Sequence, residues 1–378
     1  MITLEVDKLK VGMVVAEAVT TKRGQVIAKE GTELTHQLIA KFTFYKIEEV
    51  SVEEPEVAEP VEEDDDIFLQ EPVQEAPKKD YVSDQITYTQ RLKASPKFQQ
   101  FQSDYALNIS FLKENFDAII AGGGAECEDL LLENCESLFK GKTSLELLDM
   151  LHNMRTLDDT IYAHSLNVAL ISRGIGKWLK LDRADLNTLT LCGLLHDIGK
   201  TQLPEDILNK PGKLTDEERA LVQSHPLEGG KILKNKGFDS RIVSATIQHH
   251  ERADGTGYPR GLMDDEIGDF SYIVAIADVY DGMTSARSWR DPLCSFQVIS
   301  EFEKEGLNKY KTKFILTFLE HMASTYNNSR VMLNNAKTGR VVYINKNNLS
   351  RPLIELDGGE IIDLSSPGYK DVFIQAIL

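Results

Sequence analysis

Five of the eight histidines in this 378-residue chain lie within one window of 87 residues. In that window and just beyond it, aspartates accompany them: Asp197 directly follows a histidine at the end of a largely apolar run, and Asp278 lies in an apolar segment. Imidazole and carboxylate ligands from several separated positions are what a site for divalent transition metals requires. The sequence therefore predicts a metal-binding domain built around His164, His196, His225, His249 and His250.

Each candidate ligand also has a structural explanation. A single histidine early in an amphipathic helix, such as His164, is more often a structural residue than a ligand. The pair His196-Asp197 is different, because polar groups at the end of a buried helix cost several kcal/mol if they stay unpaired. His225 and the pair His249-His250 also end predicted helices, and an ionised Asp278 on an apolar helix needs a charge partner. Taken together, these positions favour shared metal ligation over independent structural roles.

The pattern of the chain predicts five regions and a mainly α fold. Residues 1–52 read as a small α+β module, with β-rich segments around a helical stretch from Thr35 to Phe42. Residues 53–80 read as an acidic, proline-containing linker that cannot bury enough surface to order itself. Helical spacing dominates a connecting region, 81–142, and the metal-binding domain, 143–326. A β-rich tail, 327–378, with Asp357-Gly358-Gly359 as a hairpin turn, is expected to pack on that domain.

Charge and composition exclude several classes of protein. The net charge of −18 argues against binding of DNA or other nucleic acids. Eleven of the acids lie between Glu53 and Glu75, so the rest of the chain carries an ordinary surface charge. No run approaches 18 apolar residues, and the N-terminus has no basic head before an apolar run, so neither a membrane span nor a signal peptide is expected. The scattered Cys127, Cys135, Cys192 and Cys294 form no CxxC pair, which favours reduced thiols and a cytoplasmic location.

Three segments of the predicted metal-binding domain match a known pattern. They are His196-Asp197-Ile198-Gly199-Lys200, the loop from His249 to Leu262 with its Gly257-Tyr258-Pro259 triplet, and the segment from Ala277 to Arg290. Together they resemble the HD-GYP family of HD-domain phosphohydrolases, over about half of the chain and into the β-rich tail. The resemblance implies a helical HD-type domain with a binuclear or trinuclear metal centre. It also implies hydrolysis of cyclic di-GMP to linear pGpG, and in some members to GMP, in bacterial second-messenger signalling.

The resemblance assigns the metal ligands by motif position. Trinuclear members have a glutamate four residues before the first histidine, where this chain has Thr160, and Asp159 is out of phase on a helix. We therefore expect two metals, and the residue at this position disfavours a third. The residue types accept Fe, Mn, Ni or Zn, and the resemblance favours Fe or Mn. The implied ligands are His164, His196, Asp197, His225, His249, His250 and Asp278, with Asp197 bridging the two ions.

Further residues are expected to act on the substrate. Lys200 closes the first motif and, with Asp197, is predicted to be catalytic, by stabilising negative charge or assisting proton transfer; a surface lysine is the alternative. Arg287 and Arg290 could hold phosphate or a guanine edge, because a guanidinium fork matches both, or they could be solvated surface arginines. The loop after His250 can approach a ligand closely. It contributes the substrate-site candidates Asp254, Gly257, Tyr258 and Pro259.

Three functions follow from these residues. The first is a metal-dependent cyclic di-GMP phosphodiesterase, which the intact ligand set and Lys200 favour. The second is a hydrolase of another phosphoester, such as a mixed cyclic dinucleotide. The third is a catalytically silent cyclic di-GMP sensor. Protein partners are expected at the Gly257-Tyr258-Pro259 loop or at the N-terminal module, and a homodimer is left open.

Overall fold

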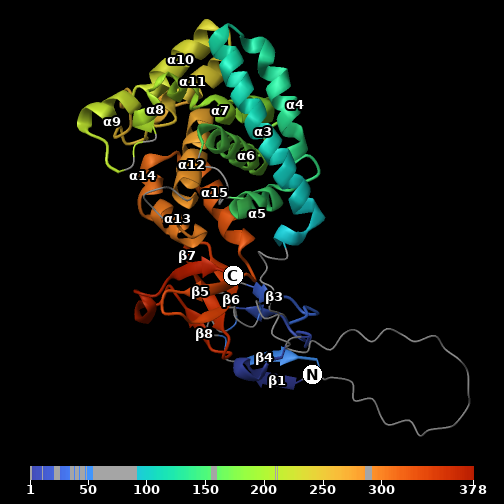
Figure 1. Cartoon of the computed structure of the whole chain (residues 1–378). Helices are drawn as coiled ribbons and strands as arrows, with labels where there is room; N and C mark the ends of the chain where they lie inside the picture. Colours follow the sequence, from blue (N-terminus) through green and yellow to red (C-terminus); the bar gives the residue numbers. More distant parts are fainter. Residues whose placement is uncertain are drawn as a thin grey trace, which may run out of the picture.

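The computed structural model describes residues 2–10, 12–20, 26–34, 38, 42, 47, 49–53, 92–154, 160–208, 210, 212–285 and 292–378. Helices dominate from Pro96 to Thr325, and strands lie before and after them. Figure 1 shows the helical domain above two smaller units that contain the strands. The predicted fold class is therefore confirmed. None of the described helices is long and apolar enough to cross a membrane.

The N-terminal unit contains two short antiparallel pairs of strands. β1 (Ile2–Glu5) pairs with β4 (Glu49–Val52), and β2 (Val19–Thr20) pairs with β3 (Val26–Ala28). Its buried side chains form a core of their own, which includes Val15, Leu34, Phe42 and Val50. Of the predicted helical stretch from Thr35 to Phe42, only Leu38 and Phe42 are described, and both are helical. The predicted linker lies outside the described residues, apart from Glu53.

The helical domain begins with a long helix, α3 (Pro96–Ala121). Ser95 caps it by accepting the N–H of Phe98 at 3.2 Å, and Gly122 ends it in a conformation with φ of 144° that suits only glycine. The predicted breaks at Pro96 and at Gly122 are thus the two ends of this helix. The other helices before the C-terminal sheet are α4 (Glu128–Phe139), α5 (Ser144–Met154), α6 (Ile161–Trp178), α7 (Arg183–Leu195), α8 (Glu205–Leu208), α9 (Asp216–Val222), α10 (His225–Asn235), α11 (Ser240–Gln248), α12 (Asp269–Thr284), α13 (Ser295–Glu301), α14 (Leu307–Lys309) and α15 (Thr312–Thr325).

Short irregular helices connect some of these elements. They are η1 (Val6–Lys8) in the N-terminal unit, η2 (Ala125–Cys127), η3 (Ile198–Gln202), η4 (Asp264–Glu266), the π-helical η5 (Phe302–Gly306) and η6 (Pro367–Tyr369). The central helix is α6, whose residues from Ala163 to Gly176 are all buried. A helix that is buried on every side needs neighbours all round, and α3, α5, α7, α12 and α15 surround α6.

One hydrophobic core joins the helices of the domain. Phe101 and Phe116 of α3 and Leu138 of α4 belong to the same buried cluster as Leu166 of α6 and Ile276 of α12. From Pro96 onward, the region predicted as a connection is therefore packed into the helical domain. A helix that contributes large side chains to a shared core cannot move independently of it.

The C-terminal part is a five-stranded antiparallel sheet in the order β8-β7-β6-β5-β9. Its strands are β5 (Arg330–Leu333), β6 (Thr338–Asn345), β7 (Asn348–Leu356), β8 (Ile361–Asp363) and β9 (Ile374–Ile377). The predicted meander corresponds to β6, β7 and β8, and Asp357-Gly358-Gly359 connects β7 to β8. Phe296 of α13 is buried in the core of the sheet, and the carboxylate of Glu303 accepts the N–H groups of Leu349 and Ser350. These contacts tie the sheet to the helical domain.

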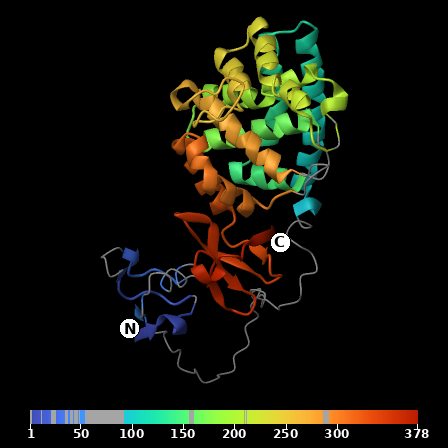
Figure 2. The ribbon, with the colours of Figure 1, turned by 90° about the vertical axis from the view of Figure 1, so that its left-hand side faces the viewer.

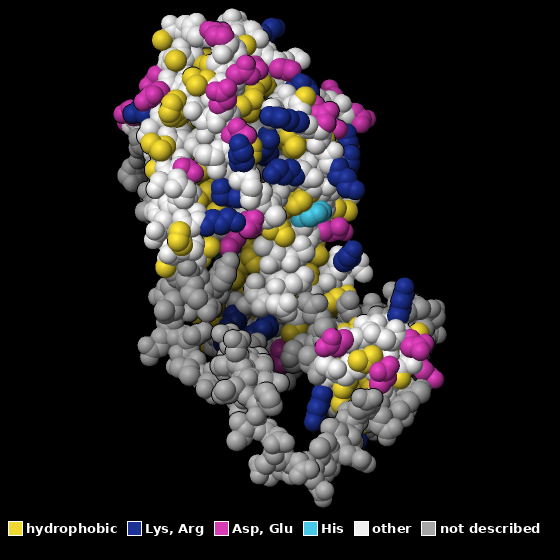
Figure 3. Space-filling model, turned by 90° about the vertical axis from the view of Figure 1, so that its right-hand side faces the viewer, with side chains coloured by type: hydrophobic (Ala, Val, Ile, Leu, Met, Phe, Trp, Pro, Cys, Tyr) yellow, Lys and Arg dark blue, Asp and Glu magenta, His cyan; other side chains and the backbone are white. Residues whose placement is uncertain are grey.

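Two further views show the arrangement of the units and one charged face. In Figure 2 the N-terminal unit and the C-terminal sheet lie at the same end of the molecule, below the helical domain. In Figure 3, Lys and Arg side chains lie across the middle of the helical domain, while Asp and Glu side chains gather nearer its top and on the smaller unit below. This face has no field of a single sign, so an anionic ligand must be held by local groups.

Candidate metal centre

Helix ends bring the predicted ligands together. His164 lies in the first turn of α6, and His196 caps the C-terminus of α7. His225, which the sequence places at the end of a helix, instead begins α10, because Pro226 is tolerated in the first turn of a helix. His249 caps the C-terminus of α11, His250 follows it, and Asp278 lies on α12. Their ligand atoms form three overlapping groups, within each of which all atoms lie within 4.8 Å of one another: His225, His249 and His250; His164, His196 and Asp278; and His196, Asp197 and His249.

Three of these histidines are held by the same backbone contact. The Nδ1 atoms of His196, His225 and His249 lie 2.8, 2.7 and 2.8 Å from the carbonyl oxygen of the residue three positions earlier. A carbonyl oxygen can only accept, so each Nδ1 carries the hydrogen and donates it. In a neutral imidazole the other nitrogen, Nε2, then presents a lone pair. The local turn thus fixes the tautomer that binds a metal through Nε2.

These lone pairs point at other acceptors. The Nε2 atoms of His225 and His249 are 3.3 Å apart, and Nε2 of His225 is 3.2 Å from Oδ1 of Asp197. His196 Nε2 and Asp197 Oδ1 are buried without a hydrogen-bond donor. Buried acceptors that face one another repel and lack solvation. A divalent cation would satisfy all of them, so the residues present fit a metal.

Asp197 divides the centre into two halves. Its Oδ1 faces His225 and His249, at 3.2 and 3.8 Å from their Nε2 atoms. Its Oδ2 faces His164 and His196, at 3.7 and 3.4 Å. A carboxylate whose two oxygens face different histidines is placed to bridge two ions. We call the group of His164, His196 and Asp278 the first half, and the group of His225, His249 and His250 the second half.

The two halves differ in their electrostatics. Burial lowers the pKa of His164, but hydrogen bonds with Asp278 at 3.0 Å and Asp281 at 2.8 Å more than offset it and raise the pKa to about 9. In the second half, burial is the main cause that holds the pKa values of His249 and His250 well below their usual range. The metal-free first half therefore holds a proton at neutral pH, whereas His249 and His250 are neutral.

The carboxylates of the centre stay ionised although they are buried. Burial by itself raises the pKa of Asp197, but His196 and Lys200 hold it well below its usual range. Burial likewise raises the pKa of Asp278, but the hydrogen bond with His164 and the charge of that protonated ring bring it well below its usual range. Both groups are thus available as anionic ligands at neutral pH.

A close contact at Gly199 sets the position of Asp197. Gly199 lies in η3, directly after the His196-Asp197 pair, and η3 packs on the start of α10. A Cβ atom at Gly199 would lie 2.0 Å from the carbonyl oxygen of His225 and 2.6 Å from the nitrogen of Gly229. Only glycine allows this approach, which brings the carboxylate of Asp197 to the imidazole of His225.

Glu251 holds the loop that follows the His249-His250 pair. This fully buried carboxylate accepts the N–H groups of Arg260 at 2.8 Å and Leu262 at 3.0 Å. A Cβ atom at Gly257 would lie 2.4 Å from the nitrogen of Arg252, so the loop folds directly onto the backbone that begins it. Our sequence analysis missed Glu251. Its signal was an acidic residue at the start of a loop rich in glycine and proline.

Two predicted substrate residues flank the metal centre. The ring of Tyr258, which precedes a cis bond to Pro259, stacks on His250 with ring centroids 4.6 Å apart. Lys200 Nζ lies 2.5 Å from Oδ2 of Asp197, and its side chain is 22% exposed. Lys200 is thus both in contact with the centre and open to solvent.

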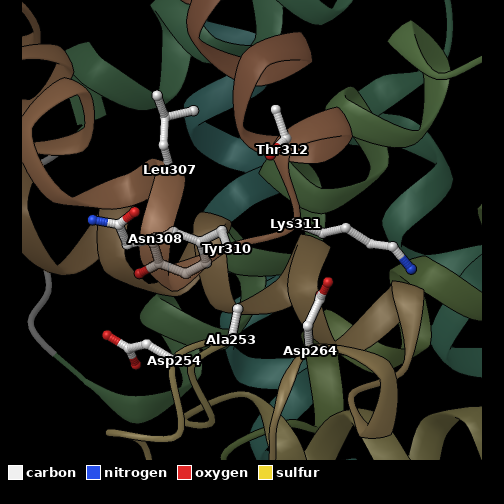
Figure 4. A pocket seen from close by; sticks show the side chains of 8 residues that line it. All are labelled: Ala253, Asp254, Asp264, Leu307, Asn308, Tyr310, Lys311 and Thr312. Atoms are coloured by element: carbon white, nitrogen blue, oxygen red, sulfur yellow. The ribbon is translucent and has the colours of Figure 1, made fainter.

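Asp254, by contrast, is not brought to the centre. The carboxylate of Asp254 accepts the N–H and hydroxyl of Thr256, and the residue lines a separate pocket of about 540 Å³. Figure 4 shows Asp254 with Asp264, Tyr310 and Lys311 around this pocket, to which none of the seven predicted ligands contributes. Arg287 and Arg290 lie outside the described residues. The hydroxyl of Thr160 accepts the N–H of Ala163 and caps α6, which is a structural role for the residue at the predicted third-metal position.

Comparison with known proteins places this centre in a family. The pattern of the HD domain matches residues 127–313. A cyclic di-GMP phosphodiesterase of Pseudomonas aeruginosa is 39% identical over 167 residues, which are 44% of this chain and 40% of the relative. One of Thermotoga maritima is 34% identical over 178 residues, 47% of this chain and 48% of the relative. A 3'3'-cGAMP-specific phosphodiesterase of Vibrio cholerae is 39% identical over 144 residues, 38% of this chain and 33% of the relative.

Each of these matches spans less than half of the relative, and the HD-domain pattern covers the histidine-bearing part of the chain. The matched region contains all seven of the predicted ligands and the η3 and loop contacts that position them. Residues 127–313 of this chain therefore form an HD domain.

Proposed function

We propose that this protein is a cyclic di-GMP phosphodiesterase of the HD-GYP type that uses two divalent metal ions. The observation that carries the proposal is the convergence of buried imidazole lone pairs on the two oxygens of Asp197. Nε2 of His196 and Oδ1 of Asp197 lie there buried without a hydrogen-bond partner. The names of the Pseudomonas and Thermotoga relatives support cyclic di-GMP as the substrate.

The ligands assigned to the two ions follow the two halves. His164, His196 and Asp278 would hold one ion, and His225, His249 and His250 would hold the other, with Asp197 shared. When bound, such ions lower the pKa of a water molecule and polarise phosphoryl oxygens. The donor set accepts Fe, Mn, Ni or Zn, and the HD-GYP resemblance favours Fe or Mn.

Two residues of the chain act on the substrate in this proposal. Lys200 is close enough to the centre to place its ammonium group beside a phosphate that lies there, where it stabilises the negative charge that develops as the ester bond breaks. Burial raises the pKa of the Tyr258 hydroxyl, so the phenol stays protonated and can donate a hydrogen bond. Because its ring already stacks on His250, Tyr258 positions a ligand without first losing conformational freedom.

A mixed cyclic dinucleotide is the second candidate substrate. The relative from Vibrio cholerae, whose name specifies 3'3'-cGAMP, is as similar in sequence as the Pseudomonas relative, at 39% identity. Both substrates would present a phosphodiester to the same centre, and the two dinucleotides differ only in one base. Discrimination then depends on groups that contact the base edges.

The test measures metal content and turnover together. The protein is purified without oxygen, reconstituted with Fe(II) or Mn(II), and given cyclic di-GMP or 3'3'-cGAMP in parallel. We expect two metals per chain and faster turnover of cyclic di-GMP than of 3'3'-cGAMP. Asp197→Ala should lose both the metals and the turnover. Faster turnover of 3'3'-cGAMP would select the second candidate. Two metals without turnover of either would indicate a sensor, and equal turnover by Asp197→Ala would remove the proposed site.

Residues 1–52 are proposed to regulate this activity or to bind a partner. Their unit has its own hydrophobic core, so it does not complete the core of the helical domain. A chain that starts near Tyr81 retains α3 and every proposed ligand, and we expect it to keep turnover while its regulation or oligomeric state changes. Loss of all turnover in a folded protein of this length would contradict the proposal.

A further inference from the structure

His164 is held differently from the other histidines of the centre. His196, His225 and His249 each donate Nδ1–H to a backbone carbonyl, whereas His164 Nδ1 lies 2.8 Å from the carboxylate Oδ2 of Asp281. A carboxylate is a charged acceptor, so this hydrogen bond is stronger than one to a neutral carbonyl. It also makes the imidazole a more electron-rich ligand through Nε2.

Asp281 is in turn bonded to Asn167, and Asn167 is bonded to Tyr105. Its Oδ1 accepts a hydrogen bond from Nδ2 of Asn167 at 3.0 Å, and Oδ1 of Asn167 accepts one from the hydroxyl of Tyr105 at 2.7 Å. The exposed fractions of Asp281, Asn167 and Tyr105 are 1%, 8% and 5%. Because an ionised carboxylate can only accept, its position dictates both the tautomer of His164 and the orientation of the Asn167 amide.

This chain of hydrogen bonds crosses three helices. Asp281 lies one turn after Asp278 on α12, Asn167 lies one turn after His164 on α6, and Tyr105 reaches in from α3. Residues 127–313 match the HD domain, so α3 precedes the matched region. A helix outside the family pattern thus contributes to the surroundings of a proposed metal ligand.

We propose that Asp281, oriented by Asn167 and Tyr105, is a positioning residue of the metal centre. It fixes the His164 ring with Nε2 toward Asp278 and Asp197, and so determines how tightly the first half of the centre binds its ion. The inference rests on the metal centre of the proposed function and is independent of the substrate.

The experiment measures Zn(II) binding to the full-length protein by competition with a chelator of known affinity. It is run at pH 9, well above the ordinary pKa of an imidazole, so that competition from protons is small in every variant. Asp281→Ala removes the acceptor, and Asp281→Asn keeps its shape but removes its charge. Tyr105→Phe removes only the far end of the chain. The control is Thr284→Ala, which removes another buried hydrogen-bonding group of α12, one that bonds to the backbone carbonyls of Tyr280 and Asp281 and not to the Asp281 carboxylate or to a proposed ligand.

We expect one of the two ions to be weakened and the other to stay within about threefold. The loss for that ion should be about 10- to 100-fold in Asp281→Ala, about tenfold in Asp281→Asn and a few-fold in Tyr105→Phe. Thr284→Ala should bind both ions as the unsubstituted protein does. A purely structural role would weaken both ions together, so the selective loss is the deciding result.

Two results would overturn the inference: unchanged binding of both ions in the Asp281 variants, or an equal loss of both ions in these variants. If Asp281→Ala does not fold, the isosteric Asp281→Asn carries the test. Selective loss of one ion in a protein that hydrolyses neither cyclic dinucleotide would sustain the inference while the proposed function fails. Turnover of a cyclic dinucleotide together with unchanged metal binding in the Asp281 variants would sustain the proposed function while the inference fails.

Discussion

The affinity of the first half of the centre for its ion should rise with pH. In the metal-free protein the pKa of His164 is raised to about 9, well above the ordinary 6.5 of an imidazole, so its ring is protonated at pH 7. A metal ligand must be neutral, and the ion therefore has to displace this proton. The affinity is lowest at acid and neutral pH, increases as the pH approaches 9, and levels off above it.

The size of the effect follows from the pKa. At pH 7 a group with a pKa of about 9 is neutral in about one molecule in a hundred, so displacement of its proton costs about a hundredfold in affinity, or about 3 kcal/mol. At pH 8 the loss is about tenfold. In the second half, the pKa values of His249 and His250 are lowered by burial, and no proton has to leave these two rings above pH 7.

The assay is chelator competition with Zn(II) at pH 7, 8 and 9, analysed for two ions. One ion should bind about tenfold more tightly for each pH unit up to about 9. In His164→Ala, that ion should be lost and the pH dependence with it. If neither ion changes its affinity between pH 7 and 9, then His164 is not protonated between Asp278 and Asp281, and our account of the first half is wrong.

Three substitutions test the frame around the centre. Glu251→Gln replaces a buried carboxylate that accepts two backbone N–H groups, so one charge-assisted hydrogen bond is lost. The free energy of unfolding, measured in urea, should fall by about 2 kcal/mol. An unchanged unfolding midpoint would show that the loop does not depend on this carboxylate. Gly199→Ala places a Cβ 2.0 Å from the carbonyl oxygen of His225 and should lower the free energy of unfolding by about 2 kcal/mol or more. Gly282→Ala, whose Cβ would meet no atom of the described residues within 4 Å, should be neutral or stabilise α12 by up to about 1 kcal/mol; similar losses in both variants would argue against packing as the cause. Asp254→Ala should leave kcat/KM within about threefold, because its carboxylate bonds to Thr256 and lines a separate pocket; a larger loss would return Asp254 to the substrate site.

Local sequence was sufficient for the parts of the structure that depend on local interactions. The ends of α3 follow from Pro96 and Gly122, and the turn between β7 and β8 follows from Asp357-Gly358-Gly359. The same is true of the tautomer of His196, because its Nδ1 bonds to a carbonyl only three residues away. Each of these features is decided within one or two turns of chain.

The sequence could not show which distant groups meet. The apolar spacing of residues 81–142 predicts helices, but it does not tell that Phe101 and Leu138 share a core with α6. Asp254 follows the His249-His250 pair closely, yet the turn that it forms with Thr256 directs its carboxylate elsewhere. Glu251 escaped notice because its two partners lie nine and eleven residues ahead, across the loop.

The sequence by itself determined the residue types that can bind a metal ion and their resemblance to a known family, but it placed His225 at the end of a helix that this residue in fact begins. Only the tertiary structure decided that Oδ1 and Oδ2 of Asp197 face different histidines, and that Tyr105 reaches His164 through Asn167 and Asp281. The physical reason is distance along the chain: these contacts join residues 28 to 117 positions apart. Such contacts form only where helices pack, and the packing depends on the whole core rather than on any motif within it.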